Sequence, residues 1–163
     1  MPTNRFRLFG ALAMAAAVLG FSAVAPVSAR AEIDPKSITI IPFDKLNFPG
    51  DPSKPQIATV FGDSTKPGLY GIVIKWPPHN NSRPHSHPND RYVTVLSGTW
   101  WINTGAKYDP DHMVPMKPGS FIIHHAGEIH YDGTKDEPAM IYIVGMGPAP
   151  QIPREDPSTA PKN

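Results

Sequence analysis

Two short stretches decide the fold: residues 85–98 read HSHPNDRYVTVLSG, and residues 118–130 read PGSFIIHHAGEIH. In the first stretch His85 and His87 are two residues apart, and on a β-strand this spacing places both side chains on one face. Neutral imidazole is the commonest metal ligand among side chains, so the pair can converge on one ion. Taken alone, an H-x-H spacing is more often a pair of ordinary polar strand residues, so the surrounding sequence decides its meaning.

The chain after residue 31 reads as short strands separated by turn residues. Apolar and β-branched residues alternate or run together for a few positions at a time, and no segment has helical periodicity with a cap at both ends. The sequence therefore predicts an all-β protein, either a sandwich or a barrel. Strands are expected at residues 37–41, 56–61, 69–76, 91–96, 99–102, 120–123, 129–132 and 140–144, and loops at 44–55 and 104–118.

The two quoted stretches resemble the two motifs of the cupin superfamily, which read roughly G-x5-H-x-H-x3,4-E-x6-G and G-x5-P-x-G-x2-H-x3-N. The resemblance extends over about residues 68–145 and implies a double-stranded β-helix, the cupin jelly-roll barrel. Gly98 and Gly127 fall where the motifs need tight backbone turns. In cupins the two histidines of the first motif and the histidine of the second bind a metal ion inside the barrel. The resemblance therefore implies metal ligands at His85, His87 and His130.

Four positions depart from these motifs. Arg91 stands where the first motif has its glutamate ligand, and a guanidinium group has no lone pair to offer a metal. His79 replaces the first glycine of the first motif, while His125 and Thr134 replace the proline and the asparagine of the second. Three-histidine iron sites are known among cupin dioxygenases. One interpretation is therefore a site with three histidines and open positions for water, oxygen or substrate.

A second interpretation takes a fourth ligand, or a group that holds the ligands in place, from Asp90 or His125. Strand alternation places residue 91 rather than Asp90 inward, although the turn at residues 88–90 can shift the register. His124 and His125 are neighbours on a strand, so only one of them can face the interior. Because a guanidinium close to a divalent ion costs Coulomb energy, we expect Arg91 to pair with an acid such as Asp90 or with an anion at the metal.

Three residues near the first motif are candidates for binding a small molecule. An inward Arg91 would select an anion, because its guanidinium binds carboxylates through two hydrogen bonds. Tyr92 is a candidate proton donor to that substrate, and Trp101 is a candidate wall of an apolar pocket. Packing is the commoner role of such aromatic residues, and of the adjacent Trp100 and Trp101 one must point outward from a regular strand.

The first 31 residues have the composition of a signal peptide. Arg5 and Arg7 precede an almost wholly apolar run over residues 8–27, and the segment closes on an A-x-A pattern at residues 29–31. An uncleaved membrane anchor is the alternative, but the small residues near the cleavage point disfavour it. We expect a signal peptide over residues 1–31, a cupin β-barrel domain over 32–147, and a proline-rich tail over 148–163 that is extended or disordered. The mature chain would begin near Glu32, be periplasmic or secreted, and have no membrane contact after cleavage.

Charge and cysteine content exclude several classes of protein. The chain has 15 lysines and arginines against 14 acids, and the first 31 residues hold three of the arginines and no acid, so the remainder is faintly acidic. Such a domain lacks the clustered basic residues that bind nucleic acid. The absence of cysteine from the sequence excludes disulfides, thiolate metal sites and a cysteine nucleophile.

The resemblance implies a metal-dependent enzyme that acts on a small molecule, an anion if Arg91 faces inward, in an oxygenase (dioxygenase-like), isomerase or lyase reaction. Histidine ligation accepts iron, manganese, zinc, nickel or copper as the single divalent ion and does not choose among them. Two alternatives stay open: a cupin that binds a metal or small ligand as a sensor or store without turnover, and a barrel whose histidines bind nothing. We also expect a homodimer, because open sheet edges need cover.

Overall fold

The computed structural model describes residues 33–160, so the predicted signal peptide over residues 1–31 lies outside the described part of the chain. By its internal contacts the chain divides into two units, one ending at Ile38 and the other beginning at Thr39. In the first unit the amides of Ser37 and Ile38 donate hydrogen bonds to the carbonyl of Asp34 and form a turn. Within residues 33–160, no helix is long and apolar enough to span a membrane.

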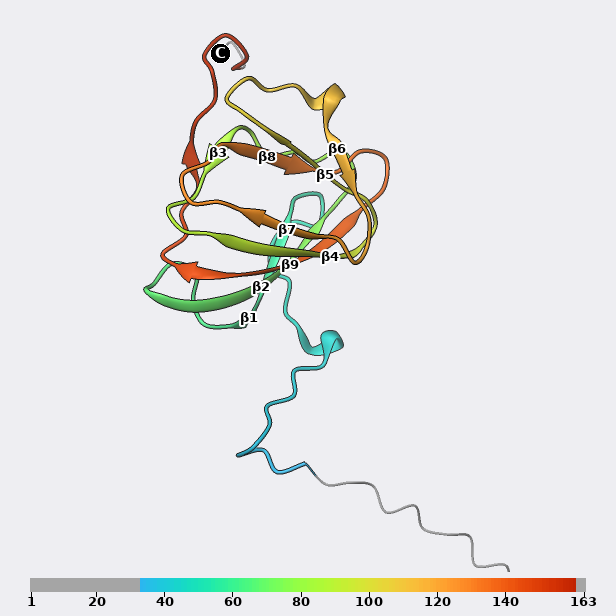
Figure 1. Ribbon diagram of the computed structural model, residues 1–163. Coiled ribbons are helices and arrows are strands. Elements are labelled where there is room, and N and C mark those ends of the chain that lie inside the picture. Colours follow the sequence, from blue (N-terminus) through green and yellow to red (C-terminus); the bar gives the residue numbers. More distant parts are fainter. Residues whose placement is uncertain (1–32, 161–163) are drawn as a thin grey trace, which may run out of the picture. The chain divides into compact units, whose positions relative to one another are not determined.

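The second unit is built from two antiparallel five-stranded sheets, drawn one above the other in Figure 1. The first sheet has the order β1 (Gln56–Phe61), β2 (Gly68–Trp76), β9 (Ala139–Gly147), β4 (Arg91–Ser97) and β7 (Phe121–His124). The second sheet has the order β10 (Ile152–Pro153), β3 (His85–Ser86), β8 (His130–Gly133), β5 (Trp100–Thr104) and β6 (Val114–Met116). Of two single-turn 3-10 helices in the described chain, η1 (Phe43–Lys45) precedes β1, and η2 (Pro110–His112) lies between β5 and β6. The predicted all-β fold is confirmed.

The hydrophobic core lies on the inner face of the first sheet. On β9, Ile141 and Ile143 are buried while Tyr142 between them is partly exposed, as expected for a strand with one face covered. Ile72 of β2 and Val93 of β4 belong to the same cluster, and so does Trp100, which comes from β5 of the second sheet. The two sheets therefore share one core, and burial of these apolar side chains holds them together.

Two sequence expectations about strands and loops are wrong. Residues 37–41 form no strand, and Ile38, Ile40 and Ile41 are exposed, because no strand of the described residues pairs with them. The expected loop over residues 104–118 contains η2 and β6, and β6 pairs with β5 through Trp100 and Met116. The proline in this short strand disguised it, and it is tolerated because β6 is at the edge of its sheet.

The tail is extended, as expected, but it contacts the second sheet. Ile152 pairs with Ser86 and Pro153 with His85, which makes β10 a short neighbour of β3. Further along, Arg83 Nε donates a hydrogen bond to Glu155 Oε2 at 3.0 Å. These contacts bring residues 150–155 beside the H-x-H motif, and the proline-rich composition gave no sign of them.

The tight turn at Gly98 gives a stability prediction. Gly98 and Gly127 both have positive φ angles, +69° and +78°, which side chains with a Cβ rarely adopt. A Cβ at Gly98 would also overlap the carbonyl oxygen of Pro138, whereas a Cβ at Gly127 would meet nothing within 4 Å. We expect Gly127→Ala to lower the free energy of unfolding by about 1–2 kcal/mol and Gly98→Ala by about 2–5 kcal/mol. Urea unfolding measures both, and equal losses would contradict the close approach at Gly98.

Candidate metal centre and ligand cavity

Three buried histidines meet between the two sheets. His85 begins β3, His87 follows it on the same face, and His130 begins β8 directly opposite His85 in the strand register. Each side chain offers one nitrogen, and these three nitrogens lie within 4.8 Å of one another. The structure thus brings together the three ligands that the motifs imply, and this group can hold a metal ion.

Hydrogen bonds to the backbone determine which ring nitrogen carries the proton in all three histidines. A carbonyl oxygen accepts a hydrogen bond from each Nδ1 atom, so Nδ1 carries the ring proton and Nε2 keeps its lone pair. The acceptors are Arg83 for His85 at 2.8 Å, Pro150 for His87 at 2.9 Å and Glu128 for His130 at 3.2 Å. Metal-ligating histidines are oriented in this way. Among the described residues, the buried Nε2 of His130 has no hydrogen-bond partner, which fits an atom that awaits an ion.

Burial keeps the rings of His87 and His130 neutral. Desolvation, and after it the charge of Arg91, lowers the pKa of His87 to about 3. Desolvation likewise lowers the pKa of His130 to about 4, with His85 as the next contribution. A ligand must present an unprotonated nitrogen, so the site is in its metal-binding protonation state at neutral pH.

His124 is the inward member of its pair. It ends β7, is buried, and lies against His130 with ring centres 3.7 Å apart and a tilt of 37° between the rings. The ring centre of Trp100 lies 5.7 Å from that of His124. Burial lowers the pKa of His124 to about 2, and in the described part of the chain its Nδ1 has no hydrogen-bond partner. His124, His130 and Asp132 form a second group whose ligand atoms lie within 4.8 Å of one another. Strand alternation predicted one inward histidine here without saying which.

His125 and Asp90 do not face the three histidines, contrary to the expectation of a fourth ligand. The His125 side chain is 68% exposed, and its Nδ1 lies 3.9 Å from Asp90 Oδ2. The other oxygen of Asp90 accepts a hydrogen bond from the amide of Ala126 at 2.8 Å. Asp90, which directly precedes β4, therefore connects the start of this strand to the second motif on the outside of the barrel.

Arg91 does face the interior. The side chain is buried, and its Nη1 donates a hydrogen bond to Nε2 of His87. In this structure Arg91 does not pair with Asp90, because neighbouring residues of an extended chain point to opposite faces. His87 Nε2 has one lone pair, so a metal ion and Arg91 cannot use it at the same time. Metal binding at the three histidines therefore requires Arg91 to move off His87.

Asp132 is a site residue that the sequence analysis missed. It lies two residues after His130 on β8, is buried, and accepts a hydrogen bond from Ser82 Oγ at 3.0 Å. Burial raises the pKa of the Asp132 carboxyl, and the nearby charges of His85 and Arg91 act in the opposite direction. The signal was available, because the two-residue spacing from His130 already places Asp132 on the ligand face.

A cavity of about 390 Å³ opens beside the histidines. One wall is apolar and comes from the inner face of β2, and the opposite side carries amide and hydroxyl groups together with a basic group. The residues that line it include Tyr70, Ile72, Ile74, Trp76, Asn80, Asn81, Ser82, His87, Arg91 and Gln151. The cavity is large enough for a small organic molecule, and it places such a molecule beside Arg91 and a metal-facing histidine.

Tyr92 and Trp101 lie outside this cavity, contrary to the sequence expectation. Tyr92 is 53% exposed on the outer face of β4. Trp101 points away from the buried Trp100, and Lys135 Nζ lies 4.2 Å from the centre of its ring. Each residue follows an inward neighbour on a regular strand, so each faces outward. The aromatic residue that packs against the histidines is Trp100, and Trp76 lines the cavity.

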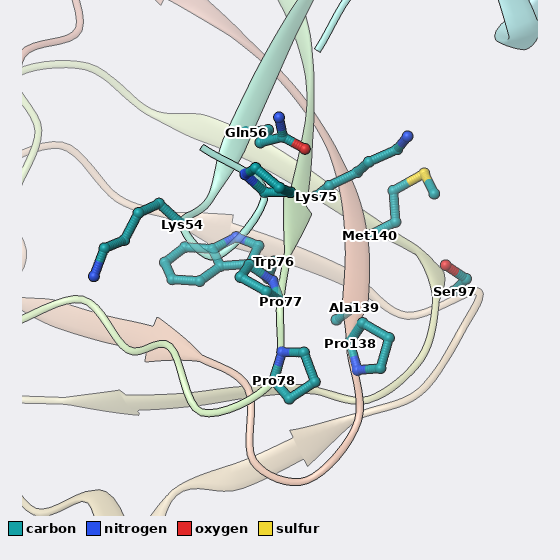
Figure 2. Close-up of a pocket in the computed structure, with 11 residues that line it drawn as sticks. Lys54, Gln56, Lys75, Trp76, Pro77, Pro78, Ser97, Pro138, Ala139 and Met140 are labelled. Carbon is teal, nitrogen blue, oxygen red and sulfur yellow. The ribbon is translucent and has the colours of Figure 1, made fainter. Parts of the chain in front are cut away.

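A second cavity of about 330 Å³ also has Trp76 in its wall (Figure 2). Prolines and the side chains of Lys54, Gln56 and Lys75 surround it. Lys75 already contacts an aromatic ring, with its Nζ 3.8 Å from the centre of Phe48. No histidine or carboxylate lines this cavity. A further cavity of about 490 Å³ is lined by His124, His125 and His130, but the 390 Å³ cavity contains both His87 and Arg91 and is the candidate ligand site.

The low pKa values predict acid sensitivity of the metal-free protein. Near pH 7, His87, His124 and His130 are neutral in both the folded and the unfolded protein. Below pH 6.5 these histidines bind protons in the unfolded chain but stay unprotonated in the folded one. The free energy of unfolding therefore decreases as the pH falls toward about 4. His124→Phe keeps a ring against Trp100 and removes one such group. With a chelator present, we expect the loss of unfolding free energy between about pH 7 and pH 5 to be about 2 kcal/mol smaller in this variant. Urea unfolding at both pH values measures it, and equal losses would contradict a neutral buried His124.

Comparisons with known proteins support the fold. No family model matches the chain, and no curated protein matches its sequence. An uncharacterized protein with a double-stranded β-helix domain from Klebsiella pneumoniae is 21% identical, with a TM-score of 0.56 over 72% of this chain and 97% of its own. The polyketide cyclase RemF from Streptomyces resistomycificus is 14% identical, with a TM-score of 0.60 over 75% and 89% of the two chains. An RmlC-like cupin from Shewanella frigidimarina is 9% identical, with a TM-score of 0.51 over 64% and 86%. This chain has the double-stranded β-helix fold of the cupin superfamily.

Proposed function

We propose that the protein is an exported, metal-dependent cupin enzyme that acts on a small anionic molecule. One divalent ion binds to His85, His87 and His130, and the reaction is of the oxygenase, isomerase or lyase type. The observation that carries this proposal is the convergence of three buried histidines beside a cavity that also contains the Arg91 guanidinium. A structural core gains little from three imidazole groups in one place, one of which leaves its buried Nε2 without a hydrogen-bond partner among the described residues, whereas a metal site needs them.

The three histidines of the site would hold the ion, and the ion would supply the chemistry. A bound divalent ion would supply a Lewis acid that polarises a substrate oxygen or acidifies a water molecule. The three carbonyl-bound histidines hold that ion and keep their rings in one orientation. Iron, manganese, zinc, nickel and copper all suit such nitrogen ligands.

Arg91 supports the choice of an anion. Once Arg91 leaves His87, its guanidinium can bind a carboxylate through two parallel hydrogen bonds, which lysine cannot do. Its buried Nε has no partner among the described residues and is free for such a bond. The apolar wall of β2 would cover the carbon body of the same molecule, and Asn80 and Asn81 offer amide groups to it. An anion at this position would also offset the repulsion between Arg91 and the ion.

The similarity to RemF shows that this fold supports an enzyme, which favours catalysis without naming a reaction. One observation favours the alternative, a cupin that binds a metal as a sensor or store. Arg91 holds the lone pair of His87 in the metal-free site, so the vacant and loaded states differ in the position of a buried cation. A difference of this kind suits a protein that reports metal binding.

Metal analysis of protein purified without a histidine tag tests the proposal. We expect one divalent ion per chain, lost in His85→Ala and His130→Ala because each removes a third of the nitrogen ligands. The exposed neighbour His125 provides the matched control, and His125→Ala should keep the ion. Retention of stoichiometric metal by His130→Ala would contradict the three-histidine site.

Arg91→Ala tests the anion-binding part in the same preparation. This variant should keep the ion and bind benzoate about tenfold or more weakly in calorimetric titrations of the zinc-loaded protein, because a charge-assisted hydrogen bond is lost. Arg91→Glu should bind the ion more tightly than the wild type. Loss of the ion from Arg91→Ala, or unchanged benzoate binding, would refute the proposed role of this side chain.

Export is part of the proposal, with a mature chain that begins at or near Glu32. The positive start, the apolar run and the A-x-A ending of residues 1–31 support it. The intact mass of protein recovered from the periplasm or medium of its native host should correspond to a chain without these residues. A mass that retains them would exclude cleavage there.

A further inference from the structure

The C-terminal tail passes beside the candidate metal centre, which lacks one ligand of the cupin motif. Position 91, which carries the glutamate ligand in that motif, holds an arginine. The tail contacts the same histidines, since β10 pairs with β3 and the carbonyl of Pro150 accepts the Nδ1 proton of His87. The residue between Pro150 and β10 is Gln151.

The Gln151 carboxamide contacts a metal-facing nitrogen. Its Nε2 lies 3.1 Å from Nε2 of His85, and the side chain lines the cavity together with His87 and Arg91. Because Nδ1 of His85 donates its proton to the carbonyl of Arg83, Nε2 of His85 is the acceptor and Gln151 is the donor. The amide group therefore lies on the side of His85 where the ligand nitrogens converge.

This hydrogen bond and a metal ion exclude each other. His85 Nε2 has a single lone pair, so an ion that binds it displaces the Gln151 N–H. The carboxamide can respond by turning about its last bond, which exchanges its nitrogen and oxygen positions with little change in shape. The turned group presents its oxygen, and amide oxygens are ligands for divalent cations. An ion that binds His87 Nε2 displaces Arg91 in the same way, but the guanidinium has no lone pair to offer the ion.

The tail holds Gln151 in place from its C-terminal side. Arg154 Nε donates a hydrogen bond to Ser86 Oγ at 3.1 Å, and the Arg154 amide donates one to the carbonyl of Pro84 at 2.9 Å. Glu155 accepts a hydrogen bond from Arg83, whose guanidinium stacks on Tyr108 with 3.7 Å to the ring centre. These contacts hold the backbone of the tail beside β3, so the exposed Gln151 side chain stays within reach of His85.

We propose that Gln151 supplies the fourth protein ligand of the metal centre, from the tail rather than from either cupin motif. The inference rests on the proposed three-histidine site. It makes the tail part of the centre, and it accounts for a first motif that lacks its glutamate.

The test compares metal affinities of untagged protein by competition with a chelator, using Co²⁺ alone as the probe. Gln151→Met removes the oxygen at nearly constant length, Gln151→Glu replaces the amide by a carboxylate, and Gln56→Met makes the same change at an amide far from the histidines, in the cavity of Figure 2. We expect Gln151→Met to bind Co²⁺ at least about tenfold more weakly and to change the visible Co²⁺ absorption bands. Gln151→Glu should bind as tightly as the wild type or more tightly, and Gln56→Met should match the wild type in affinity and spectrum.

The outcomes separate this inference from the proposed function. If Gln151→Met keeps the wild-type affinity and spectrum while His130→Ala loses the ion, the fourth-ligand assignment is wrong and the three-histidine site stands. If Gln151→Met and Gln151→Glu weaken binding equally, the side chain acts through packing and the assignment is also wrong. If the wild type binds no stoichiometric Co²⁺, both the inference and the proposed metal function are overturned.

Discussion

Hydrogen bonds from the Nδ1 atoms of three buried histidines to backbone carbonyls determine the character of the candidate site. Each bond assigns the ring proton to Nδ1 and leaves the Nε2 lone pair facing the other two rings. Burial keeps His87 and His130 neutral, and strand pairing between β3 and β8 sets His85 opposite His130. The barrel thus gathers three Nε2 lone pairs, and the one on His130 has no hydrogen-bond partner among the described residues, which is costly in a hydrophobic interior unless something binds there.

In the metal-free structure two side chains donate hydrogen bonds to two of the three Nε2 lone pairs. Arg91 donates to His87 and Gln151 donates to His85, while no group of the described chain bonds to Nε2 of His130. In the proposed metal-bound site both donors would have to move, and they would then have different chemistry. The guanidinium would be a free cation beside the ion, suited to an anionic molecule, whereas the carboxamide would turn its oxygen toward the ion.

The sequence was sufficient for the fold and for the three histidines, because both follow from short-range spacing that a resemblance to known motifs makes specific. It was weaker wherever one residue of register decides the answer. Tyr92 and Trp101 each follow an inward residue and face outward, and alternation alone does not say which of two neighbours is inward until the strand is paired. His124 rather than His125 is inward for the same reason. Asp132 was predictable from its spacing to His130 and was overlooked.

The contacts of the tail could not be predicted from the sequence, since nothing in a proline-rich segment shows that it will pair with β3 some 65 residues earlier.

A crystal structure of the zinc-loaded protein, with an anomalous difference map at the zinc edge, tests the central claim most directly. The account predicts one peak per chain, about 2.0–2.1 Å from Nε2 of His85, His87 and His130, with Arg91 withdrawn from His87. A peak bound instead by His124 and Asp132, or an Arg91 that stays on His87 in zinc-loaded crystals, would contradict it.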